Sequence, residues 1–280
     1  MLHIYSDTNQ NRRESNQDRY TAVKFSLKNG ESAHLLAVAD GMGGMDFGEQ
    51  YAQAALAAAV ACAAETVFLA EQKSLETSRA SVNTLLEEGF GGLADSFCER
   101  VNRCVVREAE EAGWGAGGAT LSACVVIADR LMTFNAGDSP IYLLRGGQAA
   151  ELGVRDNGGE QYVRENRLER GTHEYYEKAS ALTQYIGKRN GSLRTHFAKE
   201  SLAERDIVIL GSDGAFGICN CAADLQEAFG RVAASSLCDR LLAESARHTG
   251  DNQTAIVIEY FEKTAKGLFS FLKSSLGATS

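Results

Sequence analysis

The sequence predicts an α+β fold in which antiparallel sheets pack against each other and helices cover the outside. Three observations lead to this prediction. Short apolar runs typical of strands occur in groups, two helical segments separate the first group from the second, and two more helical segments precede the last strand. A doubly wound parallel sheet would instead alternate strands and helices along the whole chain, so we exclude that architecture.

Length and composition are those of a globular protein with a large core. The chain has 280 residues, enough for one large or two small domains, and 44% of them are hydrophobic. Its net charge of −9 and its isoelectric point near 5.2 argue against non-specific binding to nucleic acid. We therefore expect no nucleic-acid partner.

No targeting or membrane segment is expected. The first residues lack the basic and apolar regions of a signal peptide. The longest apolar tract, around 52–64, is mostly alanine, so we expect no segment long and apolar enough to span a bilayer. Among the seven cysteines, the one close pair, Cys219 and Cys221, has no histidine nearby to complete a zinc site. We expect free thiols in a reducing cytoplasm.

The N-terminal part predicts three strands joined by polar connections. A short strand at 1–5 is followed by a polar, turn-rich loop at 9–18, and residues 19–26 alternate as a half-buried strand does. Residues 28–31 indicate a hairpin turn. The uninterrupted apolar run 35–39 then indicates a strand buried on both faces.

Two helices are predicted next. Residues 47–69 are rich in alanine and contain no helix breaker, and residues 84–112 carry apolar side chains at close to helical spacing. The stretch 74–83 between them is polar and predicts a connection. Three glycines between 89 and 92 weaken the start of the second helix.

The second half predicts further strands, one irregular segment and two helices. Residues 153–178 are polar, charged and without a clear element, which is usual for functional or mobile segments. Short apolar runs with turn signals predict strands at 119–127, 131–135, 141–144, 193–197, 206–210 and 254–260, and helices are predicted at 216–229 and 232–248.

Acidic residues stand at the predicted strand ends. Asp40 follows the buried strand and precedes Gly41, whose lack of a Cβ lets the backbone approach a ligand closely. A carboxylate beside a bare peptide carbonyl suits a hard divalent cation. A plain Asp-Gly turn is the alternative at any one such position. Acidic residues also stand at strand ends at Asp18, Asp138, Asp213 and Asp251.

Five strand-end carboxylates suggest one shared site. Because converging carboxylates repel one another, they need cations to stay together. A site built from oxygen alone, without histidine or cysteine, favours Mg²⁺ or Mn²⁺ over Zn²⁺. Arg13 lies nearby in the sequence and offers a fork of donors that suits an oxyanion such as phosphate.

These residues stand in segments that resemble the metal-dependent serine/threonine protein phosphatases of type 2C, and most closely the compact bacterial members. The segments occur in the family's order over about residues 1–260, and the ordered set is far more specific than any one segment. They are Arg13-Glu14-Ser15-Asn16-Gln17-Asp18, Val38-Ala39-Asp40-Gly41-Met42-Gly43-Gly44, Gly118-Ala119-Thr120-Leu121, Asn135-Ala136-Gly137-Asp138-Ser139, Gly211-Ser212-Asp213-Gly214 and Asp251-Asn252-Gln253-Thr254.

The resemblance implies a specific architecture. It is a four-layer α-β-β-α sandwich, with two central antiparallel sheets flanked by helices and a metal cleft at one end. The catalytic domain would cover 1–260, with a flap-like segment at about 153–190. A C-terminal tail would follow at 261–280.

The resemblance also implies the metal ligands. Asp40 would bridge two Mn²⁺ or Mg²⁺ ions. Asp213 and Asp251 would hold one ion, and the carbonyl of Gly41 would help to hold the other. Asp138, together with Asp213, resembles the pair that holds a weaker third ion.

Three further residues match the family's motifs. Asp18 would act on the ions through bound water, Arg13 would grip the substrate phosphate, and Asn252 would orient Asp251. The resemblance implies that a water bridged between the two ions attacks phosphorus in line with the leaving seryl or threonyl oxygen. No covalent phosphoenzyme is needed, so no nucleophilic cysteine or histidine is expected.

The chain departs from the family pattern at two places and extends past it at a third. The arginine that usually follows Asp138-Ser139 is replaced by Pro140, a residue that suits a turn or the start of an edge strand. The flap-like segment lacks the Asp-His signature of many relatives, which leaves substrate choice open. Four apolar residues between 268 and 276 share one helical face, which suits a partner- or membrane-surface helix, a helix packed on its own domain, or a frayed end.

Three functions are compatible with these motifs. The leading one is an active phosphatase for phosphoserine and phosphothreonine in proteins, which opposes a serine/threonine kinase in signalling. The alternatives are a catalytically silent binding module with the same fold and a hydrolase of small phosphate esters. A silent module should have lost a bridging carboxylate, whereas Asp40, Asp213 and Asp251 are all present. For the leading function we expect a cytoplasmic monomer.

Overall fold

The computed structural model describes residues 1–42, 46–76 and 80–262. Gly43 and Gly44 of the second motif, part of the predicted connection 74–83 and all but the first two residues of the predicted tail lie outside the described residues. All seven cysteines are described, and they carry free thiols as expected.

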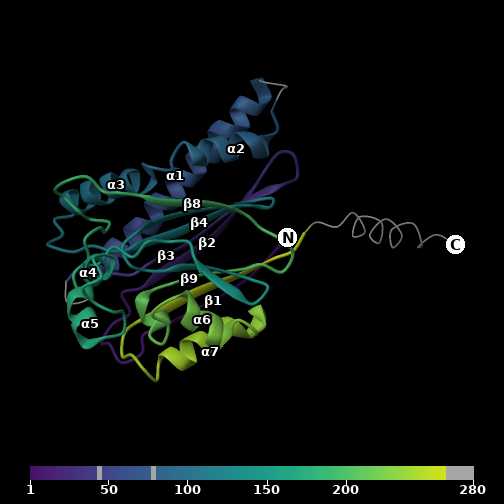
Figure 1. Cartoon of the computed structure of the whole chain (residues 1–280). Coiled ribbons are helices and arrows are strands. Elements are labelled where there is room, and N and C mark those ends of the chain that lie inside the picture. Colours follow the sequence, from purple (N-terminus) through teal and green to yellow (C-terminus); the bar gives the residue numbers. More distant parts are fainter. Residues whose placement is uncertain (43–45, 77–79, 263–280) are drawn as a thin grey trace.

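The strands form two antiparallel sheets of five strands each (Figure 1). One sheet has the order β1-β10-β9-β6-β7, and the other has the order β2-β3-β4-β5-β8. The strands are β1 (Leu2–Asn9), β2 (Arg19–Ser26), β3 (Ser32–Ala39), β4 (Leu121–Ile127), β5 (Arg130–Ala136), β6 (Ile141–Arg145), β7 (Gln148–Glu151), β8 (His196–Ser201), β9 (Ile207–Gly211) and β10 (Gln253–Tyr260).

Helices cover the outer face of each sheet, so the predicted four-layer sandwich is confirmed. In Figure 1 the helices α1, α2 and α3 lie over the β2-β3-β4-β5-β8 sheet, α6 and α7 lie under the other sheet, and α4 and α5 lie at one end. The helices are α1 (Gly48–Glu76), α2 (Val82–Gly91), α3 (Phe97–Glu111), α4 (Gly158–Arg164), α5 (His173–Ala179), α6 (Ala222–Phe229) and α7 (Ala234–Ser245), and a short 3₁₀ helix covers Asp213–Phe216.

The central strands contribute to two apolar cores at once. Along β3, Leu35 packs with the helices α1 to α3, whereas Leu36 and Val38 face the second sheet. Along β10, Val257 packs with α7 and Ile256 faces the space between the sheets. Successive side chains of a strand point to opposite faces, so a strand covered on both sides must be apolar throughout. The run 35–39 therefore predicts the doubly buried strand correctly.

The continuity of the predicted helix 84–112 is wrong. The chain forms α2 and α3, and Gly92 follows α2 with its N–H bonded to the carbonyls of Glu88 and Phe90. Glycine weakens a helix because it has the largest backbone freedom to lose, and two adjacent glycines end α2 here. The helical pattern resumes at Phe97, which is fully buried in the core.

The segment 153–178, predicted to be irregular, contains the two short helices α4 and α5. Asn157 caps α4 by accepting a hydrogen bond from the N–H of Glu160 at 3.0 Å. Thr172 caps α5 by accepting from the N–H of Tyr175 at 3.2 Å. Seven residues are too few to show a clear helical period, so the pattern could not reveal them. The short strand β7 is also missing from the prediction.

Helix α1 corrects one expectation. It has 29 residues, and its most apolar 18-residue window reaches a mean hydropathy of 1.7, so by length and composition it could cross a membrane. Half of that window is buried inside the fold, and its alanines, such as Ala52 and Ala59, pack on the sheet. A core helix meets the same two criteria, so α1 is weak evidence for a membrane span.

Candidate active site

Four of the five predicted acidic residues line one cleft and the fifth, Asp18, is buried next to it; we call all five the strand-end carboxylates. The cleft has a volume of about 1310 Å³. Asp40, Asp138, Asp213 and Asp251 line it, and Asp18 lies buried in contact with the strand that leads to Asp213. Helix α5 and the residues after it form part of another side of the cleft.

The end of β3 positions Asp40 and Gly41. The Asp40 N–H donates to the hydroxyl of Thr120 at 3.0 Å, and the Thr120 N–H donates to the Asp40 carbonyl at 2.8 Å. A Cβ on Gly41 would lie 2.5 Å from the carbonyl oxygen of Gly48 and 2.9 Å from that of Gln17. Only glycine fits there, so the sequence Asp-Gly brings this part of the backbone to the cleft.

The end of β9 positions Asp213 against the loop that carries Asp251. A Cβ on Gly214 would lie 2.0 Å from the carbonyl oxygen of Asn252, so the two loops touch through backbone. Asp213 begins the 3₁₀ helix and faces the open cleft. Glycine at 214 therefore allows two carboxylates from distant parts of the sequence to lie side by side.

Asp18 carries an unsatisfied buried oxygen. Its Oδ2 accepts a hydrogen bond from the hydroxyl of Ser212 at 2.7 Å, whereas its buried Oδ1 has no hydrogen-bond partner among the described residues. Burial, with a smaller effect from Asp213, raises the pKa of Asp18 to about 6. A buried carboxylate oxygen without a donor is costly, and a cation or its water would satisfy it. This atom fits the expected metal site.

The other strand-end carboxylates also favour a cation. Burial raises the pKa of Asp138 to about 7 and that of Asp40 well above its usual value, and neighbouring carboxylates add to both effects. The pKa of Asp213 is raised by burial and by Asp251. Because like charges and poor solvation disfavour the ionised forms, a bound divalent ion would stabilise this cluster strongly.

Arg13 reaches the cleft but pairs with Asp251. Its Nε and Nη2 donate to the two carboxylate oxygens of Asp251, both at 2.8 Å. Among the described residues, no three acidic, histidine or cysteine side chains are already grouped closely enough to hold one metal ion. The Arg13 fork occupies the carboxylate predicted as a ligand, so an ion at Asp251 and Arg13 compete for the same oxygens.

Asn252 fastens the loop that carries Arg13. Its Nδ2 donates to the carbonyls of Gln10 and Ser15, both at 2.9 Å, and its Oδ1 accepts from the N–H of Gln17 at 2.9 Å. Its own N–H donates to Oδ1 of Asp251 at 2.8 Å. The contact with Asp251 therefore comes from the backbone, while the side chain holds residues 10–17 against the start of β10.

Asp138 is held from two sides. Its Oδ2 accepts from Nδ2 of Asn157 at 3.0 Å, and the hydroxyls of Thr120 and Ser139 lie 2.7 Å apart, which links its loop to Asp40. Pro140 follows in the turn before β6. Because β6 pairs with both β7 and β9, this proline directly precedes a central strand and not an edge strand.

Sequence reasoning missed three groups of cleft residues. Asn157 has no motif of its own, and only the fold brings it to Asp138. Thr120 lies inside a quoted motif, but its hydrogen bond to Asp40 depends on the pairing of distant strands. Arg155 and Tyr175 line the cleft from a segment whose pattern gave no element.

The comparisons with known proteins identify a family and a fold. The model of the protein phosphatase 2C family matches residues 7–248, a range that includes four of the strand-end carboxylates and Arg13, with Asp251 just beyond it. No curated protein sequence matches the chain.

Solved structures share the fold over nearly the whole chain. A serine/threonine phosphatase from S. agalactiae is 23% identical, with 94% of this chain and 100% of that one covered and a TM-score of 0.68. The phosphatase PstP/Ppp from Mycobacterium tuberculosis is 22% identical, with 93% and 99% covered and a TM-score of 0.66. A catalytic domain of PstP in complex with two manganese ions is 22% identical, with 93% and 99% covered and a TM-score of 0.65. At these identities the likeness concerns the fold.

Proposed function

The chain belongs to the protein phosphatase 2C family, and we propose that it hydrolyses phosphoserine and phosphothreonine in proteins with two Mn²⁺ or Mg²⁺ ions. The observation that carries this proposal is the convergence of the strand-end carboxylates on one cleft, with Oδ1 of Asp18 buried and unsatisfied. Such a cluster is unfavourable unless cations occupy it. The PstP catalytic domain that binds two manganese ions has the same fold.

The proposed ligands of the ions come from the strand-end carboxylates and one backbone carbonyl. We propose that Asp40 bridges them, that Asp213 and Asp251 hold one ion and that the Gly41 carbonyl helps to hold the other. Asp138 and Asp213 would hold a weaker third ion. When bound, divalent ions acidify water and neutralise charge on a transferring phosphoryl group.

The remaining residues of the site orient the reactants. Asp18 is anchored through Oδ2 to Ser212, so its free Oδ1 is held in one position, where it can orient water at the ions. Arg13 binds the substrate phosphate with the fork that Asp251 occupies in this structure. Asn252 keeps the Arg13 loop in place, so the guanidinium stays at the cleft.

The same proposal includes the domain boundaries of the chain and the cellular location of the protein. The catalytic domain would cover 1–260, with 153–190 as the flap-like segment beside the cleft and 261–280 as a tail. The substrate would be a phosphoprotein whose kinase this enzyme opposes. The protein would act in signalling as a cytoplasmic monomer.

The experiment uses the full chain and four substrates. Phosphoserine, phosphothreonine and phosphotyrosine peptides are compared with p-nitrophenyl phosphate, each with Mn²⁺, with Mg²⁺ and after treatment with EDTA. We expect hydrolysis of the first two peptides only with metal and complete loss of activity with EDTA. Full activity with metal shown to be absent would contradict the metal-dependent mechanism. Activity on p-nitrophenyl phosphate alone would favour the small-ester hydrolase, and no activity on any substrate would favour the silent binding module.

A further inference from the structure

Arg155 is a buried cation in the wall of the active-site cleft. It follows β7, its side chain is only 12% exposed, and it lines the cleft together with Asp138. Of the described residues that line the cleft, Arg13 and Arg155 are the only arginines or lysines. The cleft is otherwise strongly acidic, so each of these two cations matters for a phosphate that enters it.

The guanidinium of Arg155 is fixed in place. Its Nε donates to Oε1 of Glu151 at 2.8 Å, and its Nη2 donates to the hydroxyl of Tyr142. Its carbonyl accepts from Nη2 of Arg164 at 3.0 Å. The two hydrogen bonds from the guanidinium to described residues use Nε and Nη2 and leave out Nη1, the third nitrogen, which is not among the described atoms that are buried without a partner. Arg155 therefore has one donor group to spare on a rigid support.

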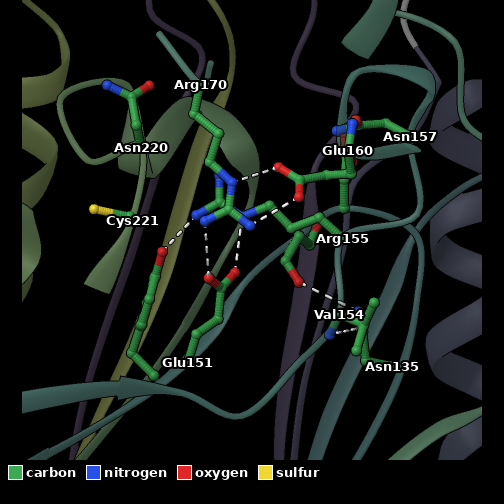
Figure 2. Close-up of polar contacts among 12 residues, drawn as sticks. Asn135, Glu151, Val154, Arg155, Asn157, Glu160, Arg170, Asn220 and Cys221 are labelled. Carbon is green, nitrogen blue, oxygen red and sulfur yellow. Dashed lines mark hydrogen bonds and ion pairs between the residues drawn. The ribbon is translucent and has the colours of Figure 1, made fainter. Parts of the chain in front are cut away.

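A network of ion pairs holds the Arg155 side chain in this position. We call Glu151, Arg155, Glu160 and Arg170 the paired wall, and Figure 2 shows the two guanidinium groups between the two carboxylates. Arg170 donates to both oxygens of Glu160 at 2.7 and 2.8 Å and lies 3.9 Å from Glu151. Tyr175 donates to Glu160 at 2.8 Å. Arg170 belongs to the same network but does not line the cleft.

The hydrogen bond from Asn157 to Asp138, at 3.0 Å, holds the segment that carries Arg155 beside the strand-end carboxylates. Arg155 also interacts electrostatically with Asp138 and Asp213. Arg13, on the other loop, also interacts electrostatically with Asp213. A phosphate that enters the cleft would meet two guanidinium groups in its lining, of which Arg13 is already paired with a carboxylate.

We propose that Arg155 is a second phosphate-binding residue of this active site, and that its Nη1 donates to a phosphoryl oxygen of the substrate and of the phosphate product. The inference rests on the proposed phosphatase function and adds a residue outside the family's motifs. Pro140 stands where the family usually has an arginine, so this chain brings a guanidinium to the cleft from a different segment.

The test compares Arg155→Met with Arg170→Met in the Mn²⁺-loaded full chain. The probe is inorganic phosphate, measured as a competitive inhibitor and by calorimetry. Because Arg155→Met would lose a hydrogen bond between charged groups, we expect it to weaken phosphate binding about tenfold to a hundredfold and to raise KM by a similar factor. Arg170→Met should leave phosphate binding within about twofold, since it breaks the network without facing the cleft. Arg155→Lys should restore part of the binding, because it keeps the charge.

Two controls separate binding from folding. Arg155→Met leaves the Glu151 carboxylate without its close partner, so the double variant Glu151→Gln with Arg155→Met removes both charges and should fold while still binding phosphate weakly. Melting temperatures and Mn²⁺ titrations are recorded for every variant. Equal phosphate affinity in wild type, Arg155→Met and the double variant would overturn the proposal, as would an equal loss in Arg170→Met. If the wild type hydrolyses nothing, the proposed function fails, and calorimetry with phosphate still decides the role of Arg155.

Discussion

Two clusters of charged side chains, the strand-end carboxylates and the paired wall behind the cleft, differ in how their charges are balanced. The strand-end carboxylates gather five negative charges and receive few donors from the protein, so that one buried oxygen of Asp18 has no partner at all among the described residues. The paired wall places two guanidinium groups against two carboxylates and satisfies nearly every atom with a hydrogen bond. The paired wall is largely buried, whereas Asp18 is the one buried member of the strand-end carboxylates and Asp213 is exposed in the cleft. Only the strand-end carboxylates require something from outside the chain.

The comparison teaches how to tell a binding site from a scaffold. Unpaired like charges raise the free energy of the folded chain, so a protein retains them only where a ligand compensates. Paired charges hold a wall in shape and need no ligand. Changes at the strand-end carboxylates should therefore reduce function with little loss of stability, whereas changes in the paired wall should reduce stability first.

Asp40→Asn should give the largest effect. The variant keeps the shape of Asp40 but removes the charge that we assign to the bridge between two ions. Turnover should fall by at least about 10²–10³-fold, the scale of losing one preorganised electrostatic group. The metal-free variant should melt no lower than the metal-free wild type, because a repelling charge is gone. Rates near the wild type in excess Mn²⁺ would show that Asp40 is not the bridge.

Arg13→Ala should have the next largest effect and should separate phosphate binding from metal binding. Loss of the guanidinium fork should raise KM about tenfold with a smaller loss of kcat. Because Arg13 occupies both oxygens of Asp251, the affinity for Mn²⁺ should stay equal or increase. Calorimetry with Mn²⁺ and steady-state kinetics measure the two effects. A weaker Mn²⁺ affinity would mean that Arg13 supports the ions and does not compete with them.

Asp138→Ala should have a moderate effect. Asp138 is held by Asn157 and shares its surroundings with Asp213, so it would hold an ion with fewer protein ligands than the central pair. We expect turnover about tenfold lower, two tightly bound ions unchanged, and an altered dependence of rate on Mn²⁺ at high concentration. Titrations of rate and of binding are compared between wild type and variant. Superimposable curves in both would make Asp138 a turn residue.

The smallest expected effect is a pH-dependent change in stability. The pKa of Asp18 is about 6 in the folded protein, above the usual value, so the folded state binds this proton more tightly than the unfolded state does. Stability from this group is full at low pH and falls as pH rises through about 6. Without metal, the melting temperature of wild type relative to Asp18→Asn should drop between pH 4.5 and 8.

With metal present, the stability of the protein should depend on pH in the opposite direction. Mn²⁺ favours ionised carboxylates, so the rise in melting temperature that it causes should be larger at pH 8 than at pH 5. A difference between wild type and Asp18→Asn that does not vary with pH in the metal-free protein would show that Asp18 is not the buried acid described here.

The sequence by itself determined most of the strands, the layered arrangement of sheets and helices, and the acidic residues of the cleft. Side chains of a strand alternate between two faces, so the uninterrupted run 35–39 could only be a strand covered on both sides. A carboxylate and a glycine at its end, Asp40-Gly41, follow from the same local rules as the pair Asp213-Gly214. These features depend on residues that are neighbours along the chain, so the sequence pattern shows them directly.

Only the tertiary structure decided which charged groups lie next to one another. Arg13 and Asp251 lie 238 residues apart in sequence and still form a double hydrogen bond. Arg155 reaches the cleft because two short capped helices and β7 hold its segment there. Each of these elements has too few residues to show a recognisable periodic pattern in the sequence. Electrostatic and hydrogen-bond energies depend on distances in space, and a sequence pattern reports such distances only within a single helix or strand.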